Sequence, residues 1–411
     1  MPRCGSLVAR YGTIIDGVII GVDASRSSGE IRTGTERYSR EVTSALILAG
    51  ARHRFRLYVR DAPLLPGREA WGEGRVEIVP VRPRRLWTHL GLGLEIARRP
   101  PDALFVSAHV LPVSQAWRRI PRSVVTIHDV GYRHFPSAHP WRQRLYLDWS
   151  TAFAGRYASA LVADSEATRL DLKRFYRIPD DRIRVAYPGL TPVPDVDEKG
   201  RRATLRRFDI QEGKAYAIYV GTLQPRKNLR RLLRAWRAVI DRLQDSDKGD
   251  GLSASPLLVV AGARGWGGED LLGDVRELGL EASVRFTGYI SDEEKAALMR
   301  GARALAFPSL YEGFGLPVLE AQSVGVPVVC SNTSALPEVA GNAALLVNPF
   351  DIADIARAIR VAMRDEGTRA ELIRAGARNV ARFSWEACAR NVLDLLEGGQ
   401  AMQSPAAPSK A

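Results

Sequence analysis

The sequence predicts an α/β protein of two domains whose parallel sheets face each other across a cleft. Three observations predict this fold class. Short apolar strands alternate with helical segments through almost the whole chain, a segment rich in proline and charge divides two similar halves, and polar or glycine residues directly follow several strands. Because neighbouring parallel strands need a long crossover connection, strand and helix in alternation indicate parallel sheets. At 411 residues the chain is also too long for one typical core.

The first half, which we assign to residues 17–195, follows an extension at 1–16 and contains seven candidate strands. Each is a short run of β-branched and other apolar residues that ends near glycine, proline or a polar residue. They are 18–24, 55–60, 76–81, 103–108, 123–129, 160–165 and 183–189.

The second half begins after a linker at 191–203, where proline and charged residues replace the apolar pattern. We assign a second domain to 196–383, with strands at 216–222, 256–263, 284–290, 304–309, 326–331 and 343–348. Apolar residues at helical spacing predict a last helix at 384–397 that packs back towards the first domain. The tail at 398–411 is polar, and we expect it to be disordered.

Composition excludes several classes of protein. The chain is 45% hydrophobic and 26% charged, as in soluble globular proteins. It has no apolar run of the roughly 18 residues that span a bilayer, and its first residues lack the apolar core of a signal peptide. Its three cysteines, Cys4, Cys330 and Cys388, are far apart and suggest neither a disulfide framework nor a zinc site. We therefore expect a cytoplasmic protein that needs no metal or cofactor.

The net charge of +13 is unevenly distributed. Eleven arginines but only three acidic residues lie between Arg82 and Arg144. A basic face of this kind can bind nucleic acid, an anionic membrane surface or a phosphorylated substrate. Since no zinc finger, RNP-type strand or KH loop is present, we expect no nucleic acid and favour a membrane surface or a phosphate group.

The segment 311–330 predicts a phosphate site. It contains a strand-loop-helix unit in which Pro317 suits the first helical position and Gly325 the position after the helix end. The residues before Pro317, Gly315 and Leu316, carry no side-chain oxygen that could cap the first turn, so the backbone N–H groups are left for an anion.

Two glutamates flank this turn, which runs through Gly313 and Phe314. Glu320, in the helix, is placed to accept hydrogen bonds from sugar hydroxyls, whereas Glu312 projects from the loop. The alternative is an ordinary glycine turn followed by a helix whose glutamate complements the helix dipole.

A second candidate site follows the strand at 216–222. Gly221 ends that strand, and Arg226 and Lys227 precede a basic helix, where their charges could neutralise a diphosphate. A solvated helix start is the alternative.

Two stretches of the first half also follow strands. His128 could donate a hydrogen bond to a substrate oxygen and Asp129 could orient it or bind a hydroxyl, although a lone histidine is more often structural; His109 is a weaker second candidate. Gly29 and Gly34 fall between the first strand and a helix that begins near Thr35, so their backbone could face the cleft. They match neither the dinucleotide fingerprint nor the P-loop.

Together these residues resemble a known family, the retaining nucleotide-sugar glycosyltransferases of family 4 (glycosyltransferase group 1, mannosyltransferase-like). Glu312 and Glu320 match its pair of glutamates separated by seven residues, and EGFGLPVLEAQSVGVPVV looks like its donor-site motif. GTLQPRKNL, VVTIHD, LVADSEATRLDL and VAYPGL resemble further family segments. The resemblance spans about 17–397 and is most specific at 304–331. It implies the GT-B architecture of two Rossmann-like domains.

The resemblance also implies residue roles. Glu320 would hold the ribose hydroxyls, Glu312 would lie beside the transferred sugar, and Arg226 and Lys227 would bind the diphosphate. The backbone of Gly313, Phe314, Gly315 and Leu316 would contact sugar and phosphates. Tyr289 or its neighbours would border the base, and His128 would face the sugar from the other domain.

This chain departs from the family at one position. Many members have Gly-Arg-Leu after the first strand of the donor domain, where this chain has Gly221, Thr222 and Leu223. We expect Arg226 to take the role of that arginine.

The resemblance implies transfer of a hexose, with mannose from GDP-mannose as the donor of choice, onto a lipid-linked or polysaccharide acceptor at the inner face of the plasma membrane. The carboxylates at 195–197 lie in the linker and are treated as solvated, so no metal site is inferred from them. Two alternatives remain: a UDP-sugar epimerase of similar fold, and a non-catalytic protein that binds sugar nucleotides.

Overall fold

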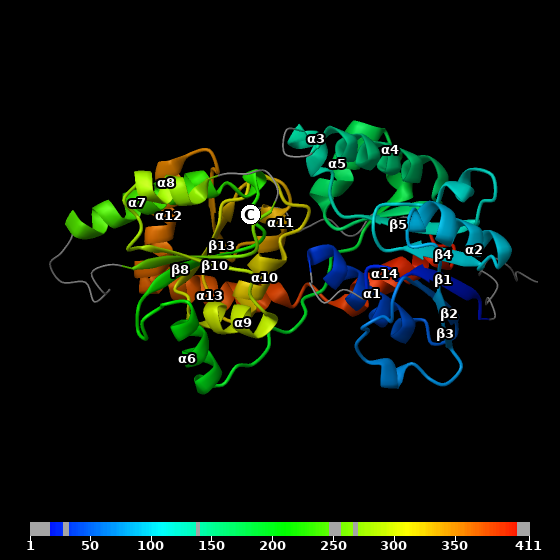
Figure 1. Ribbon diagram of the computed structural model, residues 1–411, viewed down its shortest axis with the longest axis horizontal. Helices are drawn as coiled ribbons and strands as arrows, with labels where there is room; N and C mark the ends of the chain where they lie inside the picture. The colour runs from blue at the N-terminus through cyan, green and yellow to red at the C-terminus, as the bar shows by residue number, and fades with distance from the viewer. Residues whose placement is uncertain (1–16, 28–32, 137–139, 246–255, 266–269, 401–411) are drawn as a thin grey trace, which may run out of the picture.

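The computed structural model describes residues 17–27, 33–136, 140–245, 256–265 and 270–400, and it shows two α/β domains side by side (Figure 1). The predicted extension at 1–16, Gly29 and most of the predicted tail lie outside these residues. Both sheets are parallel throughout the described strands, so the predicted fold class of two Rossmann-like domains is confirmed.

The first domain is built on a seven-stranded sheet of order β3-β2-β1-β4-β5-β6-β7. Side chains alternate between its two faces, so that Leu104 and Phe105 enter different cores. The strands are β1 (Ile19–Asp23), β2 (Arg54–Val59), β3 (Val76–Pro80), β4 (Ala103–Val106), β5 (Arg122–Ile127), β6 (Ala160–Ala163) and β7 (Ile183–Val185).

Helices cover both faces of this sheet. One core contains α1 (Gly34–Ala49) and the C-terminal α14 (Trp385–Leu396). The core on the other face contains the π-helical turn η2 (Trp87–Leu92), α2 (Gly93–Arg98), α4 (Trp141–Tyr157) and α5 (Glu166–Tyr176). The short elements are η1 (Arg68–Ala70), η3 (Val113–Ala116), α3 (Gly131–His134) and η5 (Asp180–Arg182).

The second domain has a six-stranded sheet of order β10-β9-β8-β11-β12-β13. In Figure 1, α7, α8 and α12 lie above this sheet, and α6, α9 and α13 lie below it. Its strands are β8 (Tyr216–Val220), β9 (Leu257–Ala261), β10 (Val284–Gly288), β11 (Ala304–Phe307), β12 (Val328–Ser331) and β13 (Ala344–Val347). Its helices are α6 (Glu198–Arg207), η6 (Pro225–Lys227), α7 (Leu229–Asp245), α8 (Leu271–Glu277), α9 (Asp292–Gly301), α10 (Leu316–Ser323), α11 (Leu336–Ala340), α12 (Ile352–Arg364) and α13 (Glu366–Val380).

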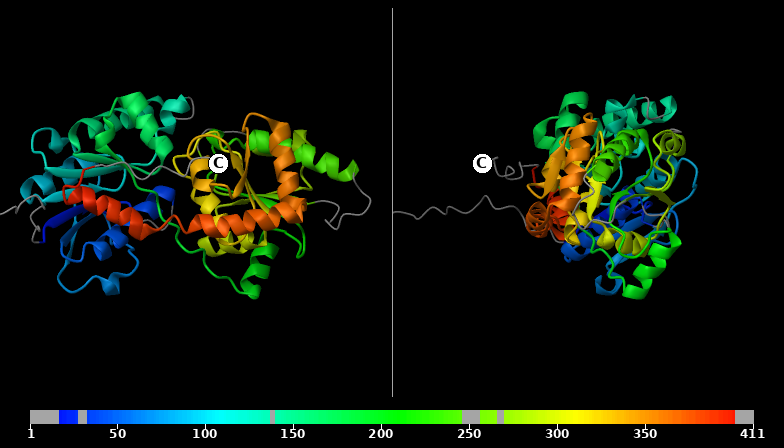
Figure 2. Two further views of the ribbon diagram at one scale, coloured as in Figure 1. Left: turned by 180° about the vertical axis from the view of Figure 1, so that it is seen from behind. Right: turned by 90° about the vertical axis from the view of Figure 1, so that its left-hand side faces the viewer.

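The chain crosses between the domains twice, and the two crossings touch. The first runs from β7 towards α6, and the second runs from α13 in the second domain to α14, which packs against α1 in the first (Figure 2). The backbone N–H of Leu190 donates to the Phe383 carbonyl at 3.3 Å, and the Trp385 indole N–H donates to Thr191 Oγ1 at 3.0 Å. The hinge is therefore a pair of segments tied to each other.

The predicted strands all form, with ends that differ by a few residues, but the linker is shorter than the 191–203 predicted. Helix α6 begins at Glu198, because the Asp197 carboxylate accepts a hydrogen bond from the Gly200 N–H at 2.7 Å and so caps its first turn. The capping role of Asp197 was not visible among the linker prolines, which dominate the local composition.

Gly189 is the residue at which the two crossings come closest. A Cβ built there would lie 2.2 Å from the backbone nitrogen of Trp385. We expect Gly189→Ala to lower the free energy of unfolding by about 2–3 kcal/mol, because backbone must move to admit the methyl group. Urea unfolding followed by circular dichroism measures this. Gly367→Ala, in helix α13 with nothing nearer than 3.4 Å, is the matched control and is expected to be neutral or slightly stabilising. Equal effects from the two changes would contradict the tight crossing.

Candidate functional site

Charged side chains meet where the carboxyl ends of β8 and β11 lie side by side. These strands are hydrogen-bonded neighbours, so the segments that follow them share one edge of the sheet. After β8 comes η6, which carries Arg226 and Lys227, and after β11 comes the loop that carries Glu312. The structure therefore brings Glu312 to two adjacent cations that lie 86 and 85 positions earlier in the chain.

The Glu312 carboxylate joins both cations. It is 6% exposed, and its two oxygens accept from Lys227 Nζ at 2.5 Å and from Arg226 Nη1 at 3.1 Å. Arg226 Nη1 also donates to the Tyr311 carbonyl at 3.0 Å, which fixes the guanidinium plane. Its Nη2 donates to no atom of the described residues, so one side of the guanidinium remains for a ligand.

Burial and charge act in opposite directions on this group. Burial would raise the pKa of Glu312, but the charges of Lys227 and Arg226 outweigh it and the pKa is lowered. For Lys227, burial and the neighbouring Arg226 together lower the pKa to about 8, although Glu312 favours the charged form. The site thus keeps two cations against one carboxylate, and its excess positive charge favours an anionic ligand.

Glu320 belongs to a second charged group, whose ion pairs join the two domains. It lies in α10 and is 3% exposed. Its Oε1 accepts from Arg37 Nη1 at 2.5 Å and from Lys295 Nζ at 2.7 Å, and Arg37 Nη2 donates to Asp292 Oδ1 at 2.6 Å. Arg37 belongs to the first turn of α1 in the first domain, whereas the other three belong to the second domain. No partner is found for Glu320 Oε2 among the described residues.

The turn before α10 differs from the sequence-based prediction in detail. Leu316 is the first helical residue and Pro317 the second, and Gly315 takes the cap position with φ of 115°, without any side-chain cap. The first turn of α10 therefore has no side-chain cap, as expected. Pro317 has no N–H group and the Val318 N–H donates to the Gly315 carbonyl at 3.0 Å, so neither offers a free donor to an anion.

Gly313 and Phe314 serve the packing of the two domains. A Cβ on Gly313 would lie 2.2 Å from the His128 carbonyl oxygen of the first domain, so glycine is needed there for contact between domains. Phe314 is buried and packs against Phe383 and Tyr187 of the hinge at ring-centroid distances of 5.7 and 6.3 Å. That the Gly313 backbone contacts a ligand stays a prediction, and its close neighbour in the structure is the His128 carbonyl.

His128 is held within its own domain. Its Nδ1 lies 2.6 Å from Asp164 Oδ2, and its Nε2 lies 3.0 Å from the Ser107 carbonyl. Burial alone would lower the pKa of His128, but the charge and hydrogen bond of Asp164 raise it. Both ring nitrogens face acceptors, which favours the doubly protonated form of the ring. The prediction that Asp129 orients His128 is wrong, since Asp164 occupies that position, and neither nitrogen is free for a substrate oxygen in this arrangement.

Asp129 and His109 lie beside this histidine. Burial would raise the pKa of Asp129, but Arg226 from the other domain and the Gly131 N–H, 2.8 Å away, lower it. Burial and the charge of His128 lower the pKa of His109 to about 4, so His109 is neutral. Asp129 thus supplies a second negative charge on the first-domain side of the cleft.

The remaining predicted residues lie around this group. Gly221 follows β8 with φ of 151°, and Gly262 approaches so closely that a Cβ on it would meet the Gly221 carbonyl at 2.0 Å. Tyr289 follows β10 and is more than half exposed. Gly34 is the first residue of α1, and a Cβ there would meet open space.

Sequence reasoning missed the residues that close the cleft. The Tyr311 hydroxyl donates to Asp171 at 2.8 Å, and its ring stacks on His134 at 4.5 Å. Glu338 accepts from the N–H groups of Glu166 and Ala167 at 2.9 and 3.0 Å, and so caps helix α5 from the other domain. Tyr311 stands next to Glu312 in the sequence, but nothing local marks Glu338, Arg37 or Lys295.

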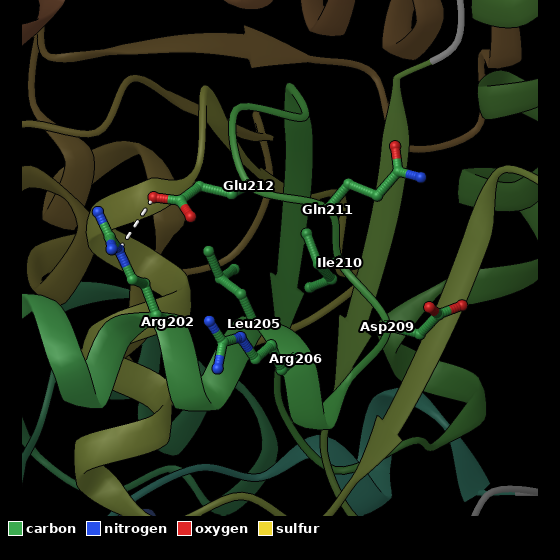
Figure 3. Close-up of a pocket in the computed structure, with 7 residues that line it drawn as sticks. All are labelled: Arg202, Leu205, Arg206, Asp209, Ile210, Gln211 and Glu212. Carbon is green, nitrogen blue, oxygen red and sulfur yellow. Dashed lines mark ion pairs between the residues drawn. The ribbon is translucent and has the colours of Figure 1, made fainter.

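A shallow hollow of about 290 Å³ is formed by residues 202–212, at α6 and the turn before β8 (Figure 3). It lies at the amino end of β8, whereas Arg226 and Lys227 follow the carboxyl end. Arg202 and Glu212 form an exposed ion pair across it at 3.1 Å. None of the charged residues brought together after β8 and β11 lines this hollow.

Within the described ranges, no three His, Cys, Asp or Glu side chains gather in a way that could hold a metal ion. That no metal or cofactor is needed remains a prediction.

Comparison with known proteins gives two family matches. The family model described as Glycosyl transferases group 1 matches residues 201–379, and the model described as Glycosyltransferase Family 4 matches residues 32–193.

Curated relatives include the O-antigen chain mannosyltransferase B of Escherichia coli, 33% identical over 284 residues, which cover 67% of this chain and 70% of that protein. The D-inositol 3-phosphate glycosyltransferase of Salinispora tropica is 33% identical over 58% of this chain and 50% of its own length. The chain matches only 28% of the serotype-specific mannosyltransferase WbdA of Escherichia coli, at 28% identity over 58% of this chain.

Solved structures share the fold at low identity. WaaG, a glycosyltransferase involved in lipopolysaccharide biosynthesis, aligns with a TM-score of 0.67 and 17% identity over 93% of this chain and all of that one. Sucrose-phosphate synthase from Thermosynechococcus elongatus aligns with a TM-score of 0.69 and 19% identity over 92% of this chain and 98% of that one. Anabaena HepE in complex with UDP and glucose aligns with a TM-score of 0.66 and 16% identity over 93% of this chain and all of that one.

The Arg37 ion pairs predict a measurable role in domain closure. In Arg37→Met, Glu320 keeps Lys295 but the link to α1 is lost, so we expect more open conformers and a larger radius of gyration in small-angle X-ray scattering. Arg40→Met is the matched control, because Arg40 lies in the same helix at similar exposure and pairs with Glu41 of that helix. Unchanged scattering of Arg37→Met would contradict the role of this contact in closure.

Proposed function

This chain belongs to glycosyltransferase family 4, and from that premise we propose that it moves a mannosyl group from GDP-mannose onto a glycan acceptor with retention at the anomeric carbon. The coarser statement, a glycosyltransferase that uses a nucleotide sugar, follows from the family and the relatives. Mannose is favoured because the O-antigen chain mannosyltransferase B is 33% identical over most of this chain.

The single observation that carries the proposal is the pair of cations at the carboxyl edge of the second sheet. Arg226 and Lys227 together outnumber the one carboxylate, Glu312, that both contact. A diphosphate beside them would accept hydrogen bonds from Arg226 Nη2 and from the backbone at the start of α10. The nucleotide ribose would then reach Glu320, whose Oε2 is free to accept from its hydroxyls.

These groups suit the chemistry of glycosyl transfer. The bond between the anomeric carbon and the β-phosphate oxygen breaks, and its electron pair passes to that oxygen. Arg226 and Lys227 stabilise the charge that develops on the diphosphate, and because they are already ordered they need little rearrangement. The acceptor hydroxyl attacks from the same face, and its proton passes to a phosphate oxygen, so no protein base is required.

The first domain contributes the acceptor side of the cleft. We propose that Asp129 and the first turn of α1, which begins at Gly34, face the acceptor. His128, held by Asp164 and Ser107, would define the wall beside the transferred sugar instead of moving a proton. Its positive charge, maintained by Asp164, would add to the potential that holds the leaving diphosphate.

The acceptor we propose is a lipid-linked or polysaccharide glycan of the cell envelope, met at the cytoplasmic face of the membrane. The O-antigen and lipopolysaccharide proteins among the relatives and structures favour this class. The helices of the described residues include none long and apolar enough to cross a membrane.

Donor choice is tested by supplying GDP-mannose, UDP-glucose, UDP-GlcNAc and dTDP-rhamnose in turn, with mass spectrometry of the glycan product. We expect transfer from GDP-mannose and an α-configured product by NMR.

Glu312→Gln, which removes the charge that orients the two cations, should lower kcat by about a hundredfold. Glu371→Gln, on the exposed face of α13, is the control and should not.

Other outcomes would favour other functions. A β-configured product would contradict retention, and transfer from a UDP-sugar alone would contradict the donor. Conversion of a UDP-sugar without any acceptor would indicate an epimerase. Tight nucleotide binding without turnover by the wild type would indicate a binding protein.

The pKa of Lys227 predicts a pH dependence. Burial, together with Arg226, lowers this pKa to about 8, so the free protein loses the Lys227 charge as pH rises through that value. We expect kcat/KM to be constant below about pH 8 and to fall towards a tenfold loss per pH unit above it. Lys227→Arg keeps its charge, so the alkaline fall should disappear even if the absolute rate is lower. The same alkaline fall in both proteins would contradict the assignment.

A further inference from the structure

Helix α4 packs Leu147, Phe153 and Tyr157, partly buried, against the core of the first domain, but it also exposes a second set of large apolar side chains. Its buried positions hold small side chains, Ser150, Thr151, Ala154 and Gly155. Its exposed positions hold large apolar ones, with exposed fractions of 62% for Trp141, 54% for Leu145, 43% for Tyr146 and 45% for Trp149. Large apolar side chains that are this exposed and lie together on one helix are unusual on a surface that meets only water, so they indicate that the outer face has a partner.

The turn η2 and helix α2 extend the same surface. Leu86, Leu90 and Leu94 are 66%, 47% and 50% exposed. They join α4 through His89, whose Nε2 lies 3.0 Å from the Tyr146 hydroxyl and whose ring lies 5.7 Å from that of Trp149. We call the exposed side chains of α4, η2 and α2 the aromatic face; it lies on the side of the sheet opposite α1 and α14 (Figure 1).

Unpaired positive charge surrounds the aromatic face. Arg85 precedes Leu86, Arg98 ends α2, and Arg142 lies over the ring of Trp141 at 5.2 Å. All three are exposed, and none forms an ion pair with any described residue. Part of the basic stretch between Arg82 and Arg144 therefore lies beside the exposed apolar side chains.

The aromatic face also reaches the edge where the cleft opens. Asp148 of α4 forms an ion pair with Arg133 at 2.6 Å. Arg133 belongs to α3, which follows β5 at the carboxyl edge of the first sheet. A molecule held on the aromatic face would thus lie beside the acceptor side of the cleft.

We propose that the aromatic face docks the protein on an anionic lipid bilayer. Tryptophan and tyrosine favour the headgroup level of a membrane, because their rings are apolar with one polar atom each. Leucines beside them would enter the acyl boundary, and unpaired arginines would meet lipid phosphates. A second copy of this chain, docked through the same face, would bring three more unpaired arginines and no matching acidic surface.

This inference deepens the proposed function, since it names the surface from which a lipid-linked acceptor would enter the cleft. It is tested without any sugar donor, however, so its failure and the failure of the proposed transfer are separate results. Transfer to a short water-soluble acceptor would remain even if the protein did not bind lipid.

The test is co-sedimentation of the full chain with vesicles of phosphatidylcholine alone or mixed with phosphatidylglycerol. We expect the protein to sediment with the mixed vesicles only, and the bound fraction to fall severalfold as salt shortens the Debye length from about 30 Å to about 8 Å. Trp141→Ser combined with Leu145→Ser should reduce vesicle binding at least about tenfold, because both side chains leave the bilayer interface.

Matched controls separate docking from general effects. Leu272→Ser removes a leucine of similar exposure, 42%, from α8 of the second domain and should bind as the wild type does. Arg85→Gln with Arg142→Gln should weaken binding, whereas Arg234→Gln with Arg374→Gln, exposed on α7 and α13, should not. Thermal unfolding of each variant checks that the fold is intact.

Three results would overturn the proposal. The wild type could fail to sediment with anionic vesicles, or the paired variants could bind as well as their controls. The wild type could instead be a dimer in analytical ultracentrifugation that Trp141→Ser with Leu145→Ser converts to monomer, with no vesicle binding. That last result would assign the aromatic face to a second copy of the chain.

Discussion

The contact on which the site depends is the buried carboxylate of Glu312 between Lys227 and Arg226. A buried charge without a partner is costly, and removing one member of such a group leaves the others uncompensated at a cost of about 3–5 kcal/mol. Each cation therefore keeps the carboxylate charged, and the carboxylate keeps Lys227 protonated against burial. The same balance leaves one net positive charge at the end of β8, so the arrangement that stabilises the loop also prepares it for an anion.

Specific contacts hold the two domains against each other. Gly313 packs against the His128 carbonyl, Glu338 caps α5 and Tyr311 binds Asp171, while the hinge itself consists of two segments bonded to each other. Two of these contacts, those of Tyr311 and Gly313, join the sequence neighbours of Glu312 to the opposite domain. The geometry of the donor loop is thus coupled to domain closure, because a shift of one domain would displace the backbone around Glu312.

The sequence predicted what is local. Strands are short apolar runs, and the pair formed by Arg226 and Lys227 follows one of them, so both the fold and the position of Glu312 could be inferred. The partners of these residues could not, because they arise from contacts between distant segments. Arg37 lies 283 residues from Glu320, and no spacing rule links them. His128 was named because it is a polar residue that follows a strand, and Asp164, which holds it, follows β6 in the same way but was not named. The large exposed apolar side chains of α4 were not predicted either, because apolar spacing does not show which of the large residues face the core.

Arg37 and Lys295 both use Oε1 of Glu320, which leaves Oε2 free. A ligand hydroxyl could therefore bind Glu320 while the contact between domains persists, so nucleotide binding and closure need not compete. If the nucleotide makes its contacts only when the domains are closed, it must favour closure by the same factor by which closure favours its binding. The interaction would then be cooperative, with Glu320 as the shared residue. A single carboxylate would hold the ribose with one oxygen and the opposite domain with the other.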